Sequence, residues 1–142
     1  MPDTPKHSVS AAGIVVDDQD RILLIQRRDN RHWEPPGGVL ELNETFEEGV
    51  KREVLEETSV NIEVGRLTGV YKNMKRGIVA LVFRCTPTAG RPHETAESAN
   101  VKWVELSEVG QMMSEAYAVR VTDAFTNQCH DRIHDGQRLY HS

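Results

Sequence analysis

The sequence is poor in cysteine, in aromatic residues and in long apolar runs. Only Cys85 and Cys129 occur among 142 residues, far apart in the chain, which excludes the disulfide framework of a small secreted domain. No stretch approaches the roughly 20 apolar residues of a membrane-spanning helix. Residues 1–8 are polar and lack the apolar core of a signal peptide. These absences predict a cytoplasmic protein with two free thiols and no membrane contact.

An excess of positive charge is missing as well. The chain has 17 Lys and Arg against 22 Asp and Glu, a net charge of −5. This balance argues against a groove for nucleic acid, which needs a basic excess. It leaves room for a small nucleotide, whose phosphates a metal ion and one or two arginines can neutralise. The length and the 38% hydrophobic content predict a single domain over residues 1–142, with peripheral tails at 1–7 and 129–142.

Short apolar runs between turn-forming residues predict strands. Residues 8–16 and 21–26 flank the turn cluster 17–20 and predict a hairpin or two adjacent strands. Residues 78–83 form an apolar run that predicts a strand buried on both faces. Weaker patterns predict strands at 61–67, 69–72 and 101–104, and a loop at 86–100.

Two helical regions are expected. Residues 45–48 have the form of a capping box and predict that a helix begins near Thr45. Phe46, Val50 and Val54 recur every fourth residue and predict its buried stripe, which Leu55 widens.

A second helical region follows Ser107, breaks near Ser114 and ends near Asn127. Strands, a helix, further strands and a C-terminal helix predict an α/β fold with mixed sheets packed between helices.

Three carboxylates of the first helix indicate a metal site. Glu53, Glu56 and Glu57 stand at offsets 0, +3 and +4, which places them on one helix face with Cβ atoms roughly 5–6 Å apart. Like charges at this spacing repel, so the helix gains nothing from them unless a cation is bound. Carboxylate oxygens are the hard ligands that Mg²⁺ prefers. The alternative is a solvated acidic helix face.

The surrounding residues extend this pattern. Gly38, five residues, Glu44, seven residues and then residues 52–57 (REVLEE) resemble the Nudix box, G-x5-E-x7-R-E-U-x-E-E-x-G-U, where U is a bulky aliphatic residue. Ser59 stands where that family usually has Gly. The resemblance implies an α/β/α sandwich. It also implies hydrolysis of a nucleoside diphosphate linked to another moiety, with Mg²⁺ or alternatively Mn²⁺ as cofactor.

The resemblance also implies roles within the box. Glu53 and Glu57 would be the main metal ligands, with Glu56 assisting. Arg52 would orient a catalytic Glu, and Glu44 would pair with Arg52.

Two glycines precede these residues. Gly38 would let its loop fold tightly over the start of the helix. Gly37 would offer its backbone carbonyl to the metal.

Outside the box, Arg27 ends a predicted strand and is expected to face the substrate phosphates, since a guanidinium binds phosphate bidentately. Arg28 is a weaker candidate for the same role. Glu97, preferred over Glu94, is expected to be a further metal ligand or the general base. Which Glu activates the attacking water stays open.

Three more features have competing interpretations. Trp33 lies beside the glycine loop and is a candidate for stacking on a base. His130 and His134 follow Cys129 with the spacing of a zinc site, but further ligands in order are missing, so a polar tail is the better interpretation. Ser59 stands at a helix end where Gly adopts a left-handed conformation. It either accepts a strain of about 1 kcal/mol or the chain leaves the helix differently.

The resemblance predicts a Mg²⁺-dependent pyrophosphohydrolase for a nucleoside triphosphate, a nucleotide sugar, ADP-ribose or a similar small nucleotide. Alternatives are a hydrolase for a non-nucleoside diphosphate or a capped RNA end, and a catalytically silent nucleotide-binding or regulatory module on the same fold. The intact set of box carboxylates argues against the silent module. Homodimers are common among relatives, and no interface is visible in the sequence.

Overall fold

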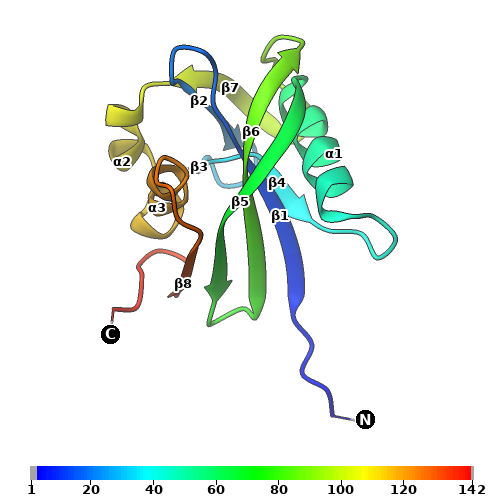
Figure 1. Ribbon diagram of the computed structural model, residues 1–142, viewed down its shortest axis with the longest axis vertical. Helices are drawn as coiled ribbons and strands as arrows, with labels where there is room; N and C mark the ends of the chain where they lie inside the picture. Colours follow the sequence, from blue (N-terminus) through cyan, green and yellow to red (C-terminus); the bar gives the residue numbers. More distant parts are fainter. Residues whose placement is uncertain (1–2, 142) are drawn as a thin grey trace.

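The computed structural model describes residues 3–141, and its elements form two sheets between helices (Figure 1). The five-stranded sheet has the order β4-β1-β6-β5-β8, and the three-stranded sheet has the order β3-β2-β7. The strands are β1 (Ser8–Val15), β2 (Ile22–Arg27), β3 (Trp33–Glu34), β4 (Gly37–Val39), β5 (Asn61–Asn73), β6 (Ile78–Ala89), β7 (Ser98–Val104) and β8 (His130–His134). The helices are α1 (Phe46–Thr58), α2 (Val109–Met112) and α3 (Glu115–Asp123), with a 3-10 turn at Leu106–Glu108.

The helices lie on opposite faces of the sheets. Helix α1 packs through Val50 and Val54 against a core that includes Val15 and Leu23. Helices α2 and α3 pack on the other side, where Ile14 and Leu24 are buried. Neighbouring strand residues thus point into different cores, which is the period of two of a strand. This α/β/α sandwich confirms the predicted fold class, and the break at Ser114 separates α2 from α3 as expected.

The first two strands differ from the prediction. Strand β1 pairs with β6 in parallel and with β4 in antiparallel orientation, whereas β2 belongs to the other sheet. Only an isolated bridge between Val16 and Ile22 joins them at the turn. The two runs are therefore not a hairpin. Strand β1 pairs with β6 and β2 pairs with β7, both far away in the sequence, which local patterns do not show.

Strand β6 is covered less completely than predicted. Ala80 and Val82 are buried, whereas Val79 and Leu81 on the opposite face are only half-buried. Strands β6 and β7 also extend into the predicted loop, which shrinks to residues 90–97.

The predicted peripheral tail at residues 129–142 is wrong for residues 130–134. They form β8, which pairs in parallel with β5 at the edge of the larger sheet, and His134 is buried. The strand has a polar sequence because its inward side chains bond to helix α3: Arg132 donates two hydrogen bonds to Asp123 at 2.8 Å each. Within residues 3–141, no helix is both long and apolar enough to span a membrane.

Candidate active site

Helix α1 begins as predicted, and its buried face matches the predicted stripe at Val50 and Val54 only. The hydroxyl of Thr45 accepts from the Glu48 N–H at 3.1 Å, and the Glu48 carboxylate accepts from the Thr45 N–H at 2.8 Å, so the capping box is confirmed. Phe46 and Leu55, expected in the buried stripe, are exposed by 49% and 45%.

Carboxylates occupy part of the buried face of α1 instead. Val50 and Val54 are fully buried, and Glu53 and Glu57 are buried beside them. The helix therefore presents an inward surface that is half apolar and half anionic.

Two glycines allow the β4 strand to lie close to this helix and to β1. A Cβ on Gly38 would lie 2.7 Å from the carboxylate of Glu53, and one on Gly37 would lie 2.5 Å from the Cβ of Ala12. Any larger residue would displace the backbone or the carboxylate. The N–H of Gly37 donates to the Glu57 carboxylate at 2.7 Å, so the loop also holds the second buried carboxylate.

Arg52 connects the acidic residues of the box. Its guanidinium donates to Glu44 at 2.6 and 3.0 Å, to Glu53 at 2.9 Å and to Glu56 at 3.4 Å. Hydrogen bonds from Arg52 lower the pKa of Glu44 to about 2. Glu44 thus holds Arg52, and Arg52 fixes the direction of the Glu53 carboxylate, which is the arrangement that the resemblance implies.

Three carboxylates meet at one point. Glu53, Glu57 and Glu97 each offer an oxygen, and these oxygens lie within 4.8 Å of one another. This is the one group of three or more His, Cys, Asp or Glu with metal-ligand spacing in residues 3–141. Glu56 lies outside it, with a half-exposed side chain bonded to Arg52. The structure brings Glu97 into the group, although it lies forty residues further along the chain.

The electrostatics of this group disfavour negative charge. Burial raises the pKa of Glu57 to about 8, and the nearby carboxylates of Glu53, Glu34 and Glu97 add to the effect against the hydrogen bond from Gly37. Burial also raises the pKa of Glu53, although Arg52 opposes this shift. Within residues 3–141, no Lys, Arg or His forms an ion pair with Glu57; the nearby Arg52 pairs with Glu53 and Glu56. Buried carboxylate oxygens whose negative charge is not balanced fit a hard divalent cation.

Arg28 positions the loop that carries Glu97. Its N–H donates to the Glu97 carbonyl at 3.1 Å, and its side chain donates to the Thr95 carbonyl at 2.9 Å and to Glu94 at 3.3 Å. Arg28 also lines a cavity with Glu57 and Glu97, so its phosphate contact stays a prediction beside its role in holding this loop. Sequence spacing gave no signal of a contact that spans 67 positions.

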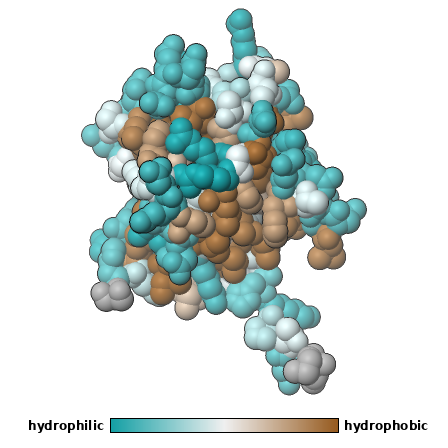
Figure 2. Space-filling model, viewed as in Figure 1, coloured by the Kyte–Doolittle hydropathy of each residue, from teal (hydrophilic) through white to brown (hydrophobic). Residues whose placement is uncertain are grey.

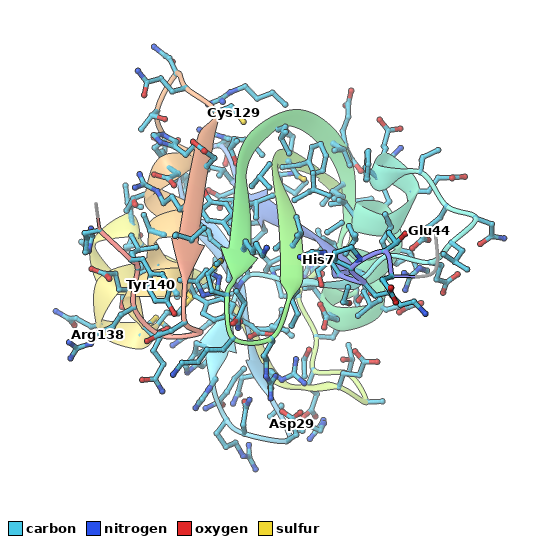
Figure 3. All side chains as sticks on the ribbon, turned by 90° about the horizontal axis from the view of Figure 1, so that it is seen from below. His7, Asp29, Glu44, Cys129, Arg138 and Tyr140 are labelled. Atoms are coloured by element: carbon cyan, nitrogen blue, oxygen red, sulfur yellow. The ribbon has the colours of Figure 1, made fainter. Side chains whose placement is uncertain are left out.

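Arg27 lines two cavities. Its guanidinium donates to Asp29 at 2.6 and 2.9 Å and to Glu34 at 3.2 Å; Figure 3 shows Asp29 on the connection after β2. It lines a cavity of about 230 Å³ together with Glu57 and Glu97. It also lines a larger cavity of about 950 Å³.

The larger cavity lies between elements that are distant in sequence. Its walls come from β3, from the β5–β6 turn and from the segment that joins α2 to α3. Trp33 is half-buried in this wall, and the Lys102 ammonium lies 5.0 Å from its ring centre. Glu34 is a site residue that the sequence did not reveal: burial raises its pKa, against the pull of Arg27. A single Glu between Trp and Pro has no pattern that distinguishes it.

The histidines near the C-terminus form no zinc site. His134 is buried with its Nε2 3.3 Å from Arg120, whereas His130 bonds to the Thr126 hydroxyl at 2.8 Å. Cys129 is exposed. These residues belong to the β8 edge and to its contacts with helix α3.

Ser59 adopts the left-handed conformation, with φ 67° and ψ 15°, and its N–H donates to the Leu55 carbonyl at 2.9 Å. Of the two alternatives, the chain therefore accepts the strain and keeps the helix ending that Gly normally provides.

The fold and the box together define an enzyme that hydrolyses phosphate-containing substrates. The family model described as NUDIX domain matches residues 6–125, and the chain belongs to the Nudix hydrolase family.

Individual proteins show how far the similarity extends. The chain is 55% identical over 136 residues to a MutT-like protein of Streptomyces ambofaciens, which covers 95% of this chain and 88% of that protein. It is 36% identical over 84 residues to an ADP-ribose pyrophosphatase of Methanocaldococcus jannaschii, but spans only 50% of that protein. A NUDIX hydrolase from Nitrosomonas europaea has the same fold, with a TM-score of 0.79 at 21% identity over 93% of this chain and 82% of that one.

Proposed function

We propose that this protein is a Mg²⁺-dependent pyrophosphohydrolase that cleaves a phosphoanhydride bond of a small nucleotide, a nucleoside diphosphate linked to another moiety. One observation carries the proposal. Glu53, Glu57 and Glu97 converge within 4.8 Å, and the pKa of Glu57 is raised by burial without a compensating side-chain cation. A divalent cation would balance this charge, and Arg27 beside it offers a cationic contact for phosphate.

The roles of the acidic residues follow from their positions. Glu53 and Glu57 would hold the ion, with the Gly37 carbonyl and Glu56 as further predicted contacts and Glu97 close by. When bound, the ion neutralises phosphate oxygens and acidifies a bound water. Arg52 would hold the Glu53 carboxylate in place for this contact.

We assign the general base to Glu97. It is exposed on its loop, so a proton taken from the attacking water can pass on to solvent. Arg28 holds the backbone of this loop and would keep Glu97 within reach of the water.

Arg27 and the larger cavity support the assignment of a nucleotide. The guanidinium now bonds to the exposed Asp29, and a substrate phosphate can replace that carboxylate. The remainder of the substrate would occupy the cavity of about 950 Å³, where Trp33 and Tyr117 offer aromatic surface and Lys75 and Arg76 add positive charge. A nucleoside triphosphate or ADP-ribose is the substrate class to test first, and ADP-ribose is in line with the name of the Methanocaldococcus jannaschii relative.

The test is product analysis on a substrate panel. Nucleoside triphosphates, ADP-ribose and nucleotide sugars are incubated with Mg²⁺, with Mn²⁺ or with a chelator, and the products are separated to show which phosphorus is attacked. We expect turnover of at least one compound, which the chelator abolishes.

Metal binding is measured in parallel by calorimetry. Glu53→Gln should weaken Mg²⁺ binding, whereas Glu47→Gln, an exposed carboxylate in the first turn of the same helix, should bind as the parent does. Absence of turnover together with undetectable Mg²⁺ and Mn²⁺ binding contradicts the proposal. Metal and nucleotide binding without turnover supports the silent module instead.

A further inference from the structure

The larger cavity has a polar wall. Most of its lining residues carry polar or charged side chains, in contrast to the apolar surface over β5 and β6 in Figure 2. A few well-placed polar groups fix the orientation of a ligand in such a cavity. A lining atom that can accept a hydrogen bond and lacks a partner therefore indicates which ligand group lies opposite.

Glu34 carries such an atom. Its Oε1 accepts from Arg27 Nη1 at 3.2 Å, whereas its Oε2 accepts no hydrogen bond from the described part of the chain. The side chain is 17% exposed, and Oε2 is not among the fully buried atoms without a partner, which in residues 3–141 are Ser98 Oγ and Arg120 Nε. Oε2 is therefore accessible, on a residue that lines the larger cavity.

The ion pair with Arg27 does not account for this carboxylate. Asp29 already binds the same guanidinium through two hydrogen bonds, at 2.6 and 2.9 Å, and is exposed, so Arg27 has an anionic partner without Glu34. A second carboxylate in the wall would repel the phosphates of a nucleotide. A hydrogen bond from the ligand to the free oxygen would offset this repulsion.

The position of Glu34 selects the ligand group. Glu34 is the last residue of β3. Pro35 and Pro36, whose rings fix φ, connect it to Gly37, which donates to Glu57 at 2.7 Å. The charge of Glu34 is accordingly one of the causes that raise the pKa of Glu57. The larger cavity thus adjoins the converging carboxylates at Glu34.

A nucleotide offers two kinds of hydrogen-bond donor, the hydroxyls of its sugar and the N–H groups of its base. With the phosphates at the metal and at Arg27, the sugar is the next group along the substrate, and its hydroxyls would be the first donors to reach Glu34. A carboxylate accepts from a ribose hydroxyl in the same way in dinucleotide-binding folds.

We propose that Glu34 accepts a hydrogen bond from the 2′ or 3′ hydroxyl of the nucleotide sugar and makes the enzyme specific for sugars that carry it. The inference rests on the proposed function, which places the phosphates beside Glu34. A sugar without that hydroxyl leaves Oε2 without a donor next to the bound substrate, so that transition-state binding is weakened.

Kinetics on a matched substrate series test the contact. Ribo-, 2′-deoxy-, 3′-deoxy- and 2′,3′-dideoxynucleotides with the base and phosphates of the most active panel compound differ only in their hydroxyls. In the parent, kcat/KM should fall roughly tenfold to a hundredfold when the bound hydroxyl is removed. In Glu34→Leu, substrates with and without it should react alike. A parent that does not distinguish the sugars, or a Glu34→Leu protein that keeps the parent ratio, overturns the proposal.

Two controls separate this contact from effects on Arg27 and on the metal. Asp29→Asn removes the other carboxylate from Arg27 and should change KM for all four sugars alike, so that their ratio stays that of the parent. Calorimetry with Mg²⁺ alone should give Glu34→Leu a Kd close to the parent's. Loss of the Mg²⁺ site would make Glu34 a metal ligand and overturn the assignment. Circular dichroism checks the fold, and Glu34→Ser, too short for the contact, is the second variant.

Binding measurements distinguish this inference from the proposed function. Calorimetry in Mg²⁺ with the matching nucleoside monophosphates, which have no phosphoanhydride bond to cleave, reports the sugar contact independently of turnover. Sugar-dependent Kd values without turnover of any panel compound contradict the hydrolase and support the contact. Turnover with equal Kd values for all sugars supports the hydrolase and contradicts the contact.

Discussion

The α1 cluster (Glu53, Glu57 and Glu97) and the α3 cluster (Tyr71, Arg120, Asp123, Arg132 and His134) each contain a buried carboxylate, but only Asp123 of the α3 cluster is held by a cationic side chain and a hydroxyl, whereas Glu57 is not. Glu57 has a backbone N–H at 2.7 Å and carboxylates around it. Asp123, by contrast, accepts from the Tyr71 hydroxyl at 2.8 Å and from Arg132 at 2.8 Å twice.

These partners change the pKa of the two carboxylates in opposite directions. Burial acts against the charged form of Asp123, but the hydrogen bonds from Arg132 and Tyr71 outweigh it and lower its pKa. The pKa of Glu57 is raised.

Arg120 of the second cluster is held by aromatic rings. Arg120 is buried, with its guanidinium 4.5 Å from the ring centre of Tyr117 and 5.1 Å from that of Tyr71. Its Nε lacks a hydrogen-bond partner, and the aromatic rings supply the contact instead. The α3 cluster therefore contributes to stability, whereas the α1 cluster leaves Glu57 without a cationic side chain and would be completed by the proposed cation.

The largest expected effect comes from removing a carboxylate at the α1 cluster. Glu57→Gln should reduce turnover on the order of 10³-fold, because several kcal/mol of metal-borne charge stabilisation is lost. The thermal midpoint in chelator should stay the same or rise, since an amide has no buried charge. Rate measurements and calorimetry on the same samples check both parts. A large loss of stability with unchanged turnover would show that Glu57 stabilises the fold and does not act in catalysis.

The α3 cluster should respond in the opposite way. Asp123→Asn leaves Arg132 without its anion and is expected to lower the free energy of unfolding by about 3 kcal/mol. Turnover per folded molecule should not change, because Asp123 lies away from the three converging carboxylates. Urea denaturation and active-site-normalised kinetics measure the two quantities. A fall in turnover at full folding would connect α3 with the site.

Acid pH should also act through the α3 cluster. Burial and the neighbouring Arg120 lower the pKa of His134 to about 4, so the ring is neutral in the folded protein. Between pH 6.5 and 4 the unfolded chain binds the extra proton. The free energy of unfolding contributed by His134 is therefore full above pH 6.5 and decreases with falling pH, by about 2 kcal/mol at pH 5.

Comparison with His134→Gln isolates this contribution. The raised pKa of Glu57 gives a slope of opposite sign, but both proteins share it, so their difference cancels it. The stability difference between the two proteins should be constant above pH 7 and should shrink toward pH 5. A difference that is independent of pH would show that His134 keeps an ordinary pKa.

The contrast between the clusters also explains which predictions were accurate. The helix start at Thr45 was predictable, because residues 45–48 carry their own hydrogen bonds. The inward face of that helix was not. An apolar period predicts that Phe46 and Leu55 are buried. It cannot show that the Gly37 N–H donates to Glu57 and that Arg52 donates to Glu53, so that these two carboxylates are buried instead.

Long-range pairing limits what local patterns reveal. Strand β1 pairs with β6, about seventy residues later, and β8 is held by Arg132 and Asp123 although its sequence looks like a tail. Glu97 was correctly expected in a loop, but its approach to Glu53 depends on Arg28, which lies in the turn after β2 and is distant in the sequence.

The smallest expected effect concerns the end of the site helix. Ser59 holds a left-handed backbone with φ 67°, which costs a residue with a Cβ about 1 kcal/mol relative to glycine. Ser59→Gly should raise the free energy of unfolding by about 0.5–1 kcal/mol, part of the gain being offset by the freer unfolded chain. Ser59→Ala keeps the Cβ and should give no such gain in urea denaturation, which separates the effect of the backbone strain from that of the hydroxyl.

Turnover should be unchanged in both variants, because the strain lies in the backbone and changes no charge. If turnover changes in Ser59→Gly alone, the helix end sets the position of Glu57, two residues before it, and the α1 cluster depends on backbone geometry as well as on charge.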